Sequence, residues 1–180
     1  MKPYVIFLRG VTPTGRNRVP MSELRVALAH AGFADVQTYI QSGNVIAKSA
    51  LDATATGQLV HEVIAREIGA DITVMTRTPH QLAAILAGNP FVTADTSKLY
   101  FSMLAARPAP DLLKALLATD FAPDRVAVVG DTIYSLFATQ YSDSKFNNNY
   151  FERKLKVAAT TRNFNTMSRL LELGEARHHG

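Results

Sequence analysis

The chain has 180 residues, of which 47% are hydrophobic, and it has no cysteine and a formal net charge of +4. A chain of this size can bury a core as one domain or as two small lobes, and without cysteine it has neither disulfides nor thiolate chemistry. The first apolar run, Tyr4 to Leu8, is too short for a signal sequence or a membrane span. We therefore expect a cytoplasmic protein without a membrane partner.

In chain order, the first half predicts a ferredoxin-like βαββαβ lobe. The expected elements are a strand over 3–8, a helix over 20–31, a hairpin over 36–47, a helix that ends at Gly69 and a strand over 72–75. The helix over 20–31 is indicated by apolar residues at spacings of three and four, and the hairpin by alternating residues around a tight turn at Ser42-Gly43. This order of elements is the split βαβ pattern.

The second half predicts a lobe of the order βαββα with terminal helices. Thr78 and Gln81 have the spacing of a capping box, so a connecting helix is expected there. After it we expect a strand over 99–104, a helix over 112–117, strands over 125–129 and 132–137, a polar segment and a last helix over 164–173. The fold class is therefore α+β, with lobes over 1–77 and 98–180, a connector over 78–97, and the lobes packed as one compact unit.

Familiar catalytic signatures fail in this sequence. Gly10 and Gly15 have the spacing of a phosphate loop, but Arg16 and Asn17 replace the lysine and the hydroxyl residue that such a loop needs. His61 begins a zinc-protease pattern whose second histidine is missing, and no other histidine spacing predicts a metal site. The sequence also has no serine elbow. It therefore specifies no catalytic residue, no metal and no cofactor.

Basic residues gather in two segments that lie far apart in the sequence. Residues 1–22 carry four basic side chains and no acidic one, and residues 142–169 carry six basic side chains and two acidic ones. A concentrated positive potential attracts phosphates, carboxylates or nucleic acid. Two solvated basic faces that never meet are the alternative interpretation.

Three polar stretches carry a resemblance to a known family. They are RGVTPTGRNRVP over 9–20, TYIQSGN over 38–44 and SDSKFNNNYFERKLKVAATTRNFNT over 142–166. These motifs resemble the family catalogued as domain of unknown function 1697 (DUF1697), over nearly the whole chain. The resemblance implies a bacterial-type cytosolic α+β protein and implies no particular activity. The chain departs from the family in three places. Residues 12–15 replace a stretch that usually contains asparagine and glycines, Phe164 replaces a usual tryptophan, and residues 139–141 replace a stretch that often contains glycines.

Structural roles compete with binding roles in each stretch. Gly43 suits the hairpin turn, Asn44 suits a bond to the turn backbone, and Asn163 suits the N-cap of the last helix. Three consecutive asparagines over 147–149 inside a helix would cost about 1.5–2 kcal/mol relative to alanine. We therefore expect some of these amides to bond a specific partner, which is either another loop or a ligand.

Together the stretches predict an anion site. Asparagine and threonine supply neutral donors, and arginine and lysine supply charged ones. We expect nine residues to line one cleft, namely Arg9, Arg16, Asn17, Asn44, Lys145, Asn149, Arg153, Arg162 and Asn163. The favoured function is binding of a small phosphorylated or carboxylated ligand. One alternative is an RNA or nucleic-acid binding module, in which Tyr39 or Tyr150 stacks on a base. A second is a protein-interaction or dimerisation module without catalysis.

Overall fold

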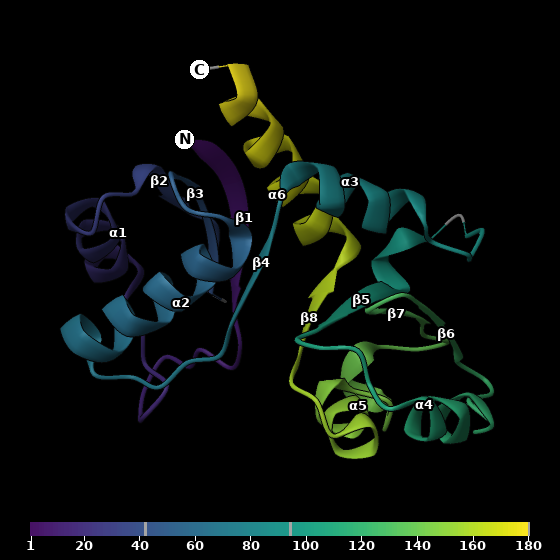
Figure 1. Ribbon diagram of the computed structural model, residues 1–180. Coiled ribbons are helices and arrows are strands. Elements are labelled where there is room, and N and C mark those ends of the chain that lie inside the picture. Colours follow the sequence, from purple (N-terminus) through teal and green to yellow (C-terminus); the bar gives the residue numbers. More distant parts are fainter. Residues whose placement is uncertain (42, 94, 180) are drawn as a thin grey trace. The chain divides into compact units, whose positions relative to one another are not determined.

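The computed structural model describes residues 1–41, 43–93 and 95–179 of the chain (Figure 1). It is a mixed α+β protein, as the sequence predicts, and it has two four-stranded antiparallel sheets. Its contacts divide it into a first unit of residues 1–84 and 169–180 and a second unit of residues 85–168. Helices α3 (Pro79–Ala87) and α6 (Phe164–Ala176) each contribute residues to both units. The boundaries expected at 77/78 and 97/98 stay a prediction.

The first unit has the predicted order of elements. Its elements are β1 (Lys2–Leu8), α1 (Met21–His30), β2 (Ala34–Thr38), β3 (Asn44–Ser49), α2 (Ala53–Val63) and β4 (Val74–Arg77). The strands pair antiparallel in the order β2-β3-β1-β4, so β1 is hydrogen-bonded on both edges. The assignment of this unit to the ferredoxin-like class stays a prediction. The predicted turn residue Ser42 lies outside the described residues.

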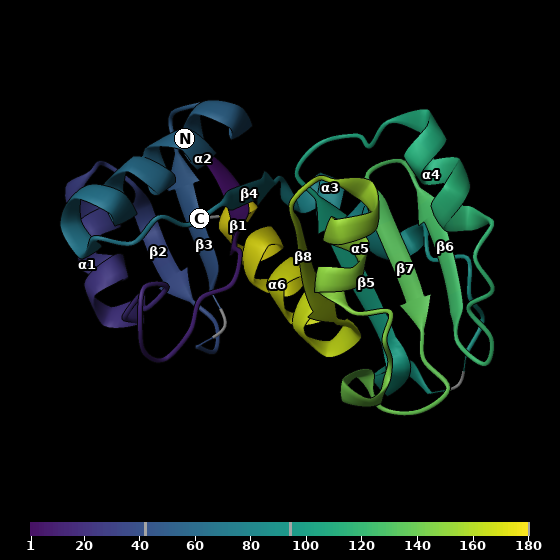
Figure 2. The same cartoon turned by 90° about the horizontal axis from the view of Figure 1, so that it is seen from below.

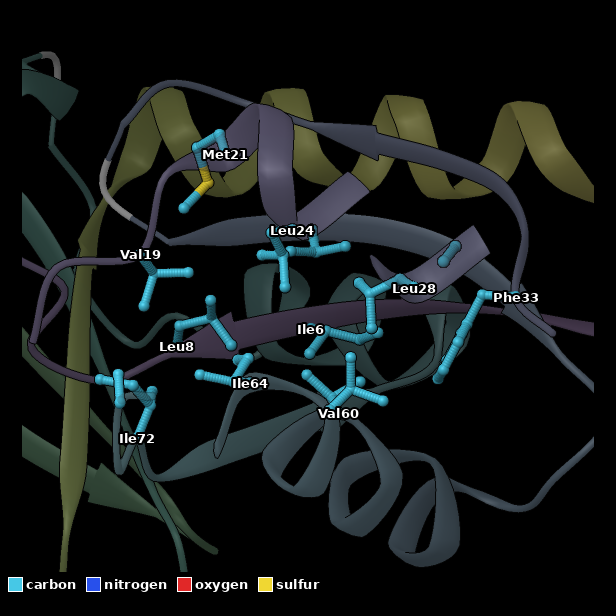
Figure 3. Close-up of a cluster of buried hydrophobic side chains, with 14 of the residues drawn as sticks. Ile6, Leu8, Val19, Met21, Leu24, Leu28, Phe33, Val60, Ile64 and Ile72 are labelled. Atoms are coloured by element: carbon cyan, nitrogen blue, oxygen red, sulfur yellow. The ribbon is translucent and has the colours of Figure 1, made fainter. Parts of the chain in front are cut away.

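One apolar core fills the space between this sheet and helices α1 and α2. Figure 3 shows side chains of α1, β1 and α2 pointing toward one another, with Leu24 and Leu28 opposite Ile6 and Val60. All four side chains are fully buried. The spacing of three and four residues that predicted α1 therefore marks the face that α1 buries.

Helix α2 ends in a wider turn that the sequence did not predict. The chain continues as a π-helical turn over Ile64–Ile68, and Gly69 N–H donates to the Ile64 carbonyl at 2.9 Å. Gly69 then stops the helix at a φ of +84°, in the left-handed region that suits glycine. The predicted end of this helix at Gly69 is confirmed. The side chain of Ile64, the first residue of this turn, is fully buried and lies next to Leu8 in the core (Figure 3).

The second unit repeats the same order of elements. They are β5 (Leu99–Leu104), α4 (Pro110–Leu117), β6 (Arg125–Val129), β7 (Thr132–Leu136), α5 (Asn148–Leu155) and β8 (Ala159–Asn163). The strand order is β6-β7-β5-β8, all antiparallel (Figure 2). The predicted order βαββα was wrong in one respect, because the Ala-Thr-Thr-Arg-Asn stretch forms strand β8 on the free edge of β5. Its threonines favour extended backbone, and the paired edge satisfies its amides.

The two faces of the second sheet are covered differently. Helices α4 and α5 lie on one face (Figure 1), where Leu116 and Phe151 pack with Ile133. On the other face, the ring of Phe164 lies 6.4 Å from that of Phe101. The connecting helix α3 begins with the predicted capping box, since Thr78 N–H donates to Gln81 Oε1 and Gln81 N–H to Thr78 Oγ1. No helix in the described part of the chain is long and apolar enough to cross a membrane.

Two glycines with the same backbone angle give a matched test of this fold. Gly43 and Gly15 both have a φ of +81°, but a Cβ on Gly43 would lie 2.8 Å from Leu8 Cβ, whereas a Cβ on Gly15 would meet nothing within 4 Å. We expect Gly15→Ala to lower the free energy of unfolding by about 1–2 kcal/mol, the cost of left-handed backbone. Gly43→Ala should cost about 1–3 kcal/mol more, because Leu8 must move. Urea denaturation of both variants measures the difference, and equal losses would contradict the close approach.

Candidate functional site

The loop over 9–20 is closed on itself by backbone hydrogen bonds. Thr12 N–H donates to the Asn17 carbonyl at 3.0 Å, and Arg18 N–H donates to the Gly15 carbonyl at 3.3 Å. Gly10 has a φ of +71°, and the Asn17 amide lies over it, 3.7 Å from the place of a Cβ. These contacts give the loop a defined shape and hold Arg16 and Arg18 on its outside, where both side chains are exposed.

The two polar stretches of the first unit meet. Leu8 N–H, at the end of β1, donates to the Gly43 carbonyl at 2.8 Å. Asn44 is fully buried, and its Nδ2 donates to the Tyr39 carbonyl at 3.1 Å. The structural interpretation of Gly43 and Asn44, as residues that shape and bond the hairpin turn, is therefore confirmed. A buried amide with this bond positions the turn beside the loop over 9–20.

A cavity of about 320 Å³ lies where these two segments meet. It is lined by Val11, Thr12, Pro13, Arg18, Val19, Pro20 and Gln41. Arg18 and Gln41 were not among the nine predicted site residues, because a lining position depends on how two loops meet and not on residue type. In the part of the chain that the structure describes, the guanidinium groups of Arg16 and Arg18 make no ion pair or hydrogen bond.

Helix α1 begins at the wall of this cavity. Pro20 is its N-cap residue, with a φ of −64°, and no side chain caps this end of the helix. The first N–H groups of a helix have no partner within the helix, and they carry its positive dipole end. Glu23 is the acidic residue of this first turn. The start of the helix therefore offers backbone N–H donors next to Arg18, while the Glu23 carboxylate offsets the positive potential of the dipole.

In the second unit, the three asparagines begin a helix instead of interrupting one. Asn147 is the N-cap of α5, and its Oδ1 accepts the N–H of Tyr150 at 3.0 Å. Asn148 and Asn149 are the first two residues of the helix, so the interior-helix cost predicted for the run does not arise. The aromatic residues of this segment pack inward as predicted, since Tyr150 and Phe151 are buried.

Asn148 provides the specific partner that the sequence led us to expect. Its Nδ2 donates to the Ala159 carbonyl at 2.9 Å, and its Oδ1 accepts from Thr161 Oγ1 at 2.8 Å. Thr161 Oγ1 in turn lies 2.7 Å from Ser102 Oγ on β5. Glu152 Oε2 accepts the Ala159 N–H at 2.9 Å. These bonds join α5 to β8, so this amide has a structural role.

Arg162 and Asn163 lie at the end of β8. Asn163 Oδ1 accepts the Thr166 N–H at 2.8 Å, which confirms that it caps α6. One amino group of the Arg162 guanidinium donates to Thr160 Oγ1 at 2.6 Å and to the Thr161 carbonyl at 3.0 Å. Burial lowers the pKa of Arg162 from its ordinary value to about 10. Because burial disfavours its charged form, Arg162 at neutral pH is a charged group in an unfavourable environment.

Two further predicted cations lie over aromatic rings of α5 and its approach. Lys145 Nζ lies 5.1 Å from the ring centre of Phe146, and the Arg153 guanidinium lies 5.6 Å from that of Tyr150. Both side chains are exposed, where such contacts stabilise weakly.

The nine predicted residues are divided between the two units. Arg9, Arg16, Asn17 and Asn44 belong to the first unit, and Lys145, Asn149, Arg153, Arg162 and Asn163 belong to the second. That all nine line one cleft stays a prediction. The described residues contain no group of three or more acidic, histidine or cysteine side chains that could hold a metal ion.

Comparison with known proteins places the chain in a family. The model of the family described as "Protein of unknown function (DUF1697)" matches residues 1–134, so the chain belongs to this family and the resemblance is confirmed. The asparagine-rich segment and the Thr-Thr-Arg-Asn motif lie beyond the matched residues. No curated protein matches the sequence.

A solved structure shares the fold. It is that of the conserved bacterial protein SP0830 from Streptococcus pneumoniae, which is 19% identical in sequence with a TM-score of 0.72. The match covers 97% of this chain and 99% of the other. At this identity the likeness shows a common fold, and it carries no statement about activity.

Two neighbouring asparagines test the network between α5 and β8. Asn148→Ala should lower the free energy of unfolding by about 1–3 kcal/mol, because the Ala159 carbonyl and the Thr161 hydroxyl lose a buried partner. Asn149→Ala should change it by less than about 0.5 kcal/mol, as exposed substitutions usually do. Urea denaturation of the pair measures this, and equal effects would mean that the network does not stabilise the fold.

The lowered pKa of Arg162 predicts a pH dependence of stability. Since the folded pKa is below the unfolded one, the unfolded chain binds this proton more tightly, and the penalty fades as pH rises through about 10. The free energy of unfolding of the wild type, relative to Arg162→Met, should therefore rise above about pH 9, by at most about 1.4 kcal/mol per pH unit. The exposed Arg107→Met is the control and should give a flat difference. A flat difference for Arg162→Met as well would contradict the burial of its charge.

Proposed function

We propose that this protein binds a small anionic molecule, either phosphorylated or carboxylated, at the cavity between the loop over 9–20 and the β2–β3 turn. The observation that carries the proposal is the presence of Arg18 on the wall of a cavity of about 320 Å³ without an acidic partner. A volume near 300 Å³ is at the lower end of the range for ligand pockets. The ligand we infer is therefore a small metabolite.

The charges around the cavity support an anion. The segment over 9–20 contains Arg9, Arg16 and Arg18 and no acidic residue. Arginine binds phosphate and carboxylate groups through two parallel hydrogen bonds, and the uncapped start of α1 adds backbone donors. Thr12 and Gln41, which also line the cavity, supply neutral donors and acceptors. Asn17 and Asn44 support the site indirectly, because they hold the loop and the turn.

The cavity is proposed to bind its ligand without acid–base catalysis. Among the residues that the structure describes, those that line the cavity include no carboxylate, histidine or cysteine. General acid–base catalysis requires a group of this kind within hydrogen-bond reach of the reacting proton. We therefore infer a binding role, and a reaction at this site would have to depend on positioning of the anion by Arg18.

The contribution of Lys145, Asn149, Arg153, Arg162 and Asn163 to ligand binding stays a prediction. The hydrogen bonds of Asn163 and the buried position of Arg162 favour structural roles for these two residues. Lys145, Asn149 and Arg153 have exposed side chains and are the members of this group that are open to a ligand.

The alternative function, nucleic-acid binding, differs in its salt dependence. Contacts to many phosphates give a steep fall of affinity with salt, because each neutralised phosphate releases counterions. A single anion held by Arg18 gives a shallow dependence. Tyr150, one of the two tyrosines considered for base stacking, is buried against Phe146 and Phe151, which weakens the nucleic-acid interpretation.

Calorimetric titration with inorganic phosphate, and then with a panel of sugar phosphates and dicarboxylates, tests the proposal. We expect Arg18→Met to weaken binding of the best ligand about tenfold or more, since a charge-assisted hydrogen bond contributes about 1.5–3 kcal/mol. Arg16→Ala and Arg18→Met should both keep the wild-type melting temperature, because these side chains are exposed.

Lys2→Met is the matched control. Lys2 is exposed and lies at the opposite end of β1 from the loop over 9–20, so its replacement removes the same charge without touching the cavity. Equal weakening by Lys2→Met and Arg18→Met would show that only net charge matters. Absence of binding across the panel, or a salt slope that corresponds to many phosphates, would contradict the proposed site.

A further inference from the structure

The second unit contains a cavity whose lining includes none of the nine residues of the predicted anion site. Its volume is about 450 Å³, which falls within the usual range for small-molecule sites. It is lined by Ser97, Lys98, Tyr100, Thr139, Gln140, Tyr141 and Ser142. All of these residues belong to the second unit, so the cavity is complete within one body.

Two stacked tyrosines form the aromatic part of the wall. The rings of Tyr100 and Tyr141 lie 4.7 Å apart with an angle of 24° between their planes, and Phe137 packs edge-on against both. Both tyrosines are only partly buried. The Tyr141 hydroxyl accepts the N–H of Asn148 at the start of α5, at 2.9 Å. The ring of Tyr141 is therefore fixed in position by the helix and by the stack.

The loop that carries Gln140 is held at both ends by one carboxylate. Asp124 Oδ1 accepts the Ala138 N–H and Oδ2 accepts from the Ser144 hydroxyl, each at 2.9 Å. Between these two points, the N–H groups of Asp143 and Ser144 close a short 3₁₀ turn over Tyr141–Asp143. A loop fixed in this way loses little conformational entropy when a ligand binds.

The charge around this cavity is nearly balanced, in contrast to the loop over 9–20. Lys98 is the basic residue of its lining, and its Nζ donates to the Ala138 carbonyl at 3.2 Å. The hydroxyl of Ser97 and then its N–H donate to the Asp95 carboxylate, and these two bonds lower the pKa of Asp95. Asp95 therefore places a carboxylate against Ser97, which lines the cavity. An anionic ligand would gain little net attraction here, because the charges of Lys98 and Asp95 nearly cancel. A neutral polar ring is repelled by neither charge.

We propose that this cavity binds a neutral planar heterocycle with hydrogen-bonding edges, of the kind found in nucleosides. The tyrosine pair provides a flat aromatic surface, on which a heterocycle stacks in an offset arrangement. Gln140 carries both a donor and an acceptor on one amide, which matches the paired donor and acceptor of a base edge. Ser97, Thr139 and Ser142 supply hydroxyls for the polar remainder of the ligand. The site shares no lining residue with the cavity proposed to bind an anion in the first unit.

Titration of the isotope-labelled full chain with adenosine, guanosine, cytidine and uridine, followed by NMR, tests this proposal. We expect millimolar nucleoside to shift the amide resonances of residues 97–100 and 139–142. Gln140→Ala should raise the dissociation constant about fivefold, the effect of one lost hydrogen bond. Tyr141→Leu should raise it about tenfold or more through loss of stacking. Gln58→Ala, an exposed glutamine of α2, is the matched control and should leave it unchanged.

Three results would overturn the proposal. The first is that none of the four nucleosides shifts the resonances of the lining residues. The second is that ribose 5-phosphate, which lacks the base, shifts them at the same concentration as the nucleosides. The third is that Gln140→Ala, whose exposed side chain is not needed for folding, binds as tightly as the wild type. The Gln140 variant decides the question even where Tyr141→Leu fails to fold.

Discussion

A strand that is hydrogen-bonded on both edges determines the layout of each unit. β1 pairs with β3 and β4, and β5 pairs with β7 and β8. With both edges occupied, the backbone of such a strand has no polar group left for water, so its side chains can be apolar on both faces. Ile6 and Phe7 on opposite faces of β1 are both fully buried. A polar side chain inside such a strand needs a hydrogen-bond partner, as Ser102 on β5 has in Thr161. The loops that follow the strands are richer in polar residues, and they line the two cavities described above.

Elements whose cause is local were predictable from the sequence. The bounds of β5 and β6 follow from short apolar runs between turn residues, and the start of α3 follows from the Thr78 and Gln81 pair, which bond to each other. Strand β8 was not predictable in this way. Its sequence is polar on both faces, and it becomes a strand because an edge of β5 is available to it. The π-turn after Val63 was likewise not predictable, since the helical spacing of apolar residues gives no sign of it.

The candidate site was predictable as a region and not as a list of residues. Glycines and arginines marked the loop over 9–20, and Asn44 was recognised as a possible turn residue, which its bond to Tyr39 bears out. Arg18 and Gln41 line the cavity, and they were missed because their positions depend on the meeting of two loops. The asparagines over 147–149 were predicted to lie inside a helix. In the structure Asn147 caps α5 and so sets where the helix begins, and the spacing of apolar residues alone does not reveal this starting point.

The two units share one topology, yet they differ in the connection that follows their central strands. Twelve residues, 9–20, link β1 to α1, whereas five residues, 105–109, link β5 to α4. Both connections lead to a helix that has a proline at its start. In a short connection the chain passes directly from strand to helix and has no length with which to enclose a ligand. The long connection therefore supplies most of the wall of a cavity in the first unit, whereas the short one supplies no lining residue to the cavity of the second unit.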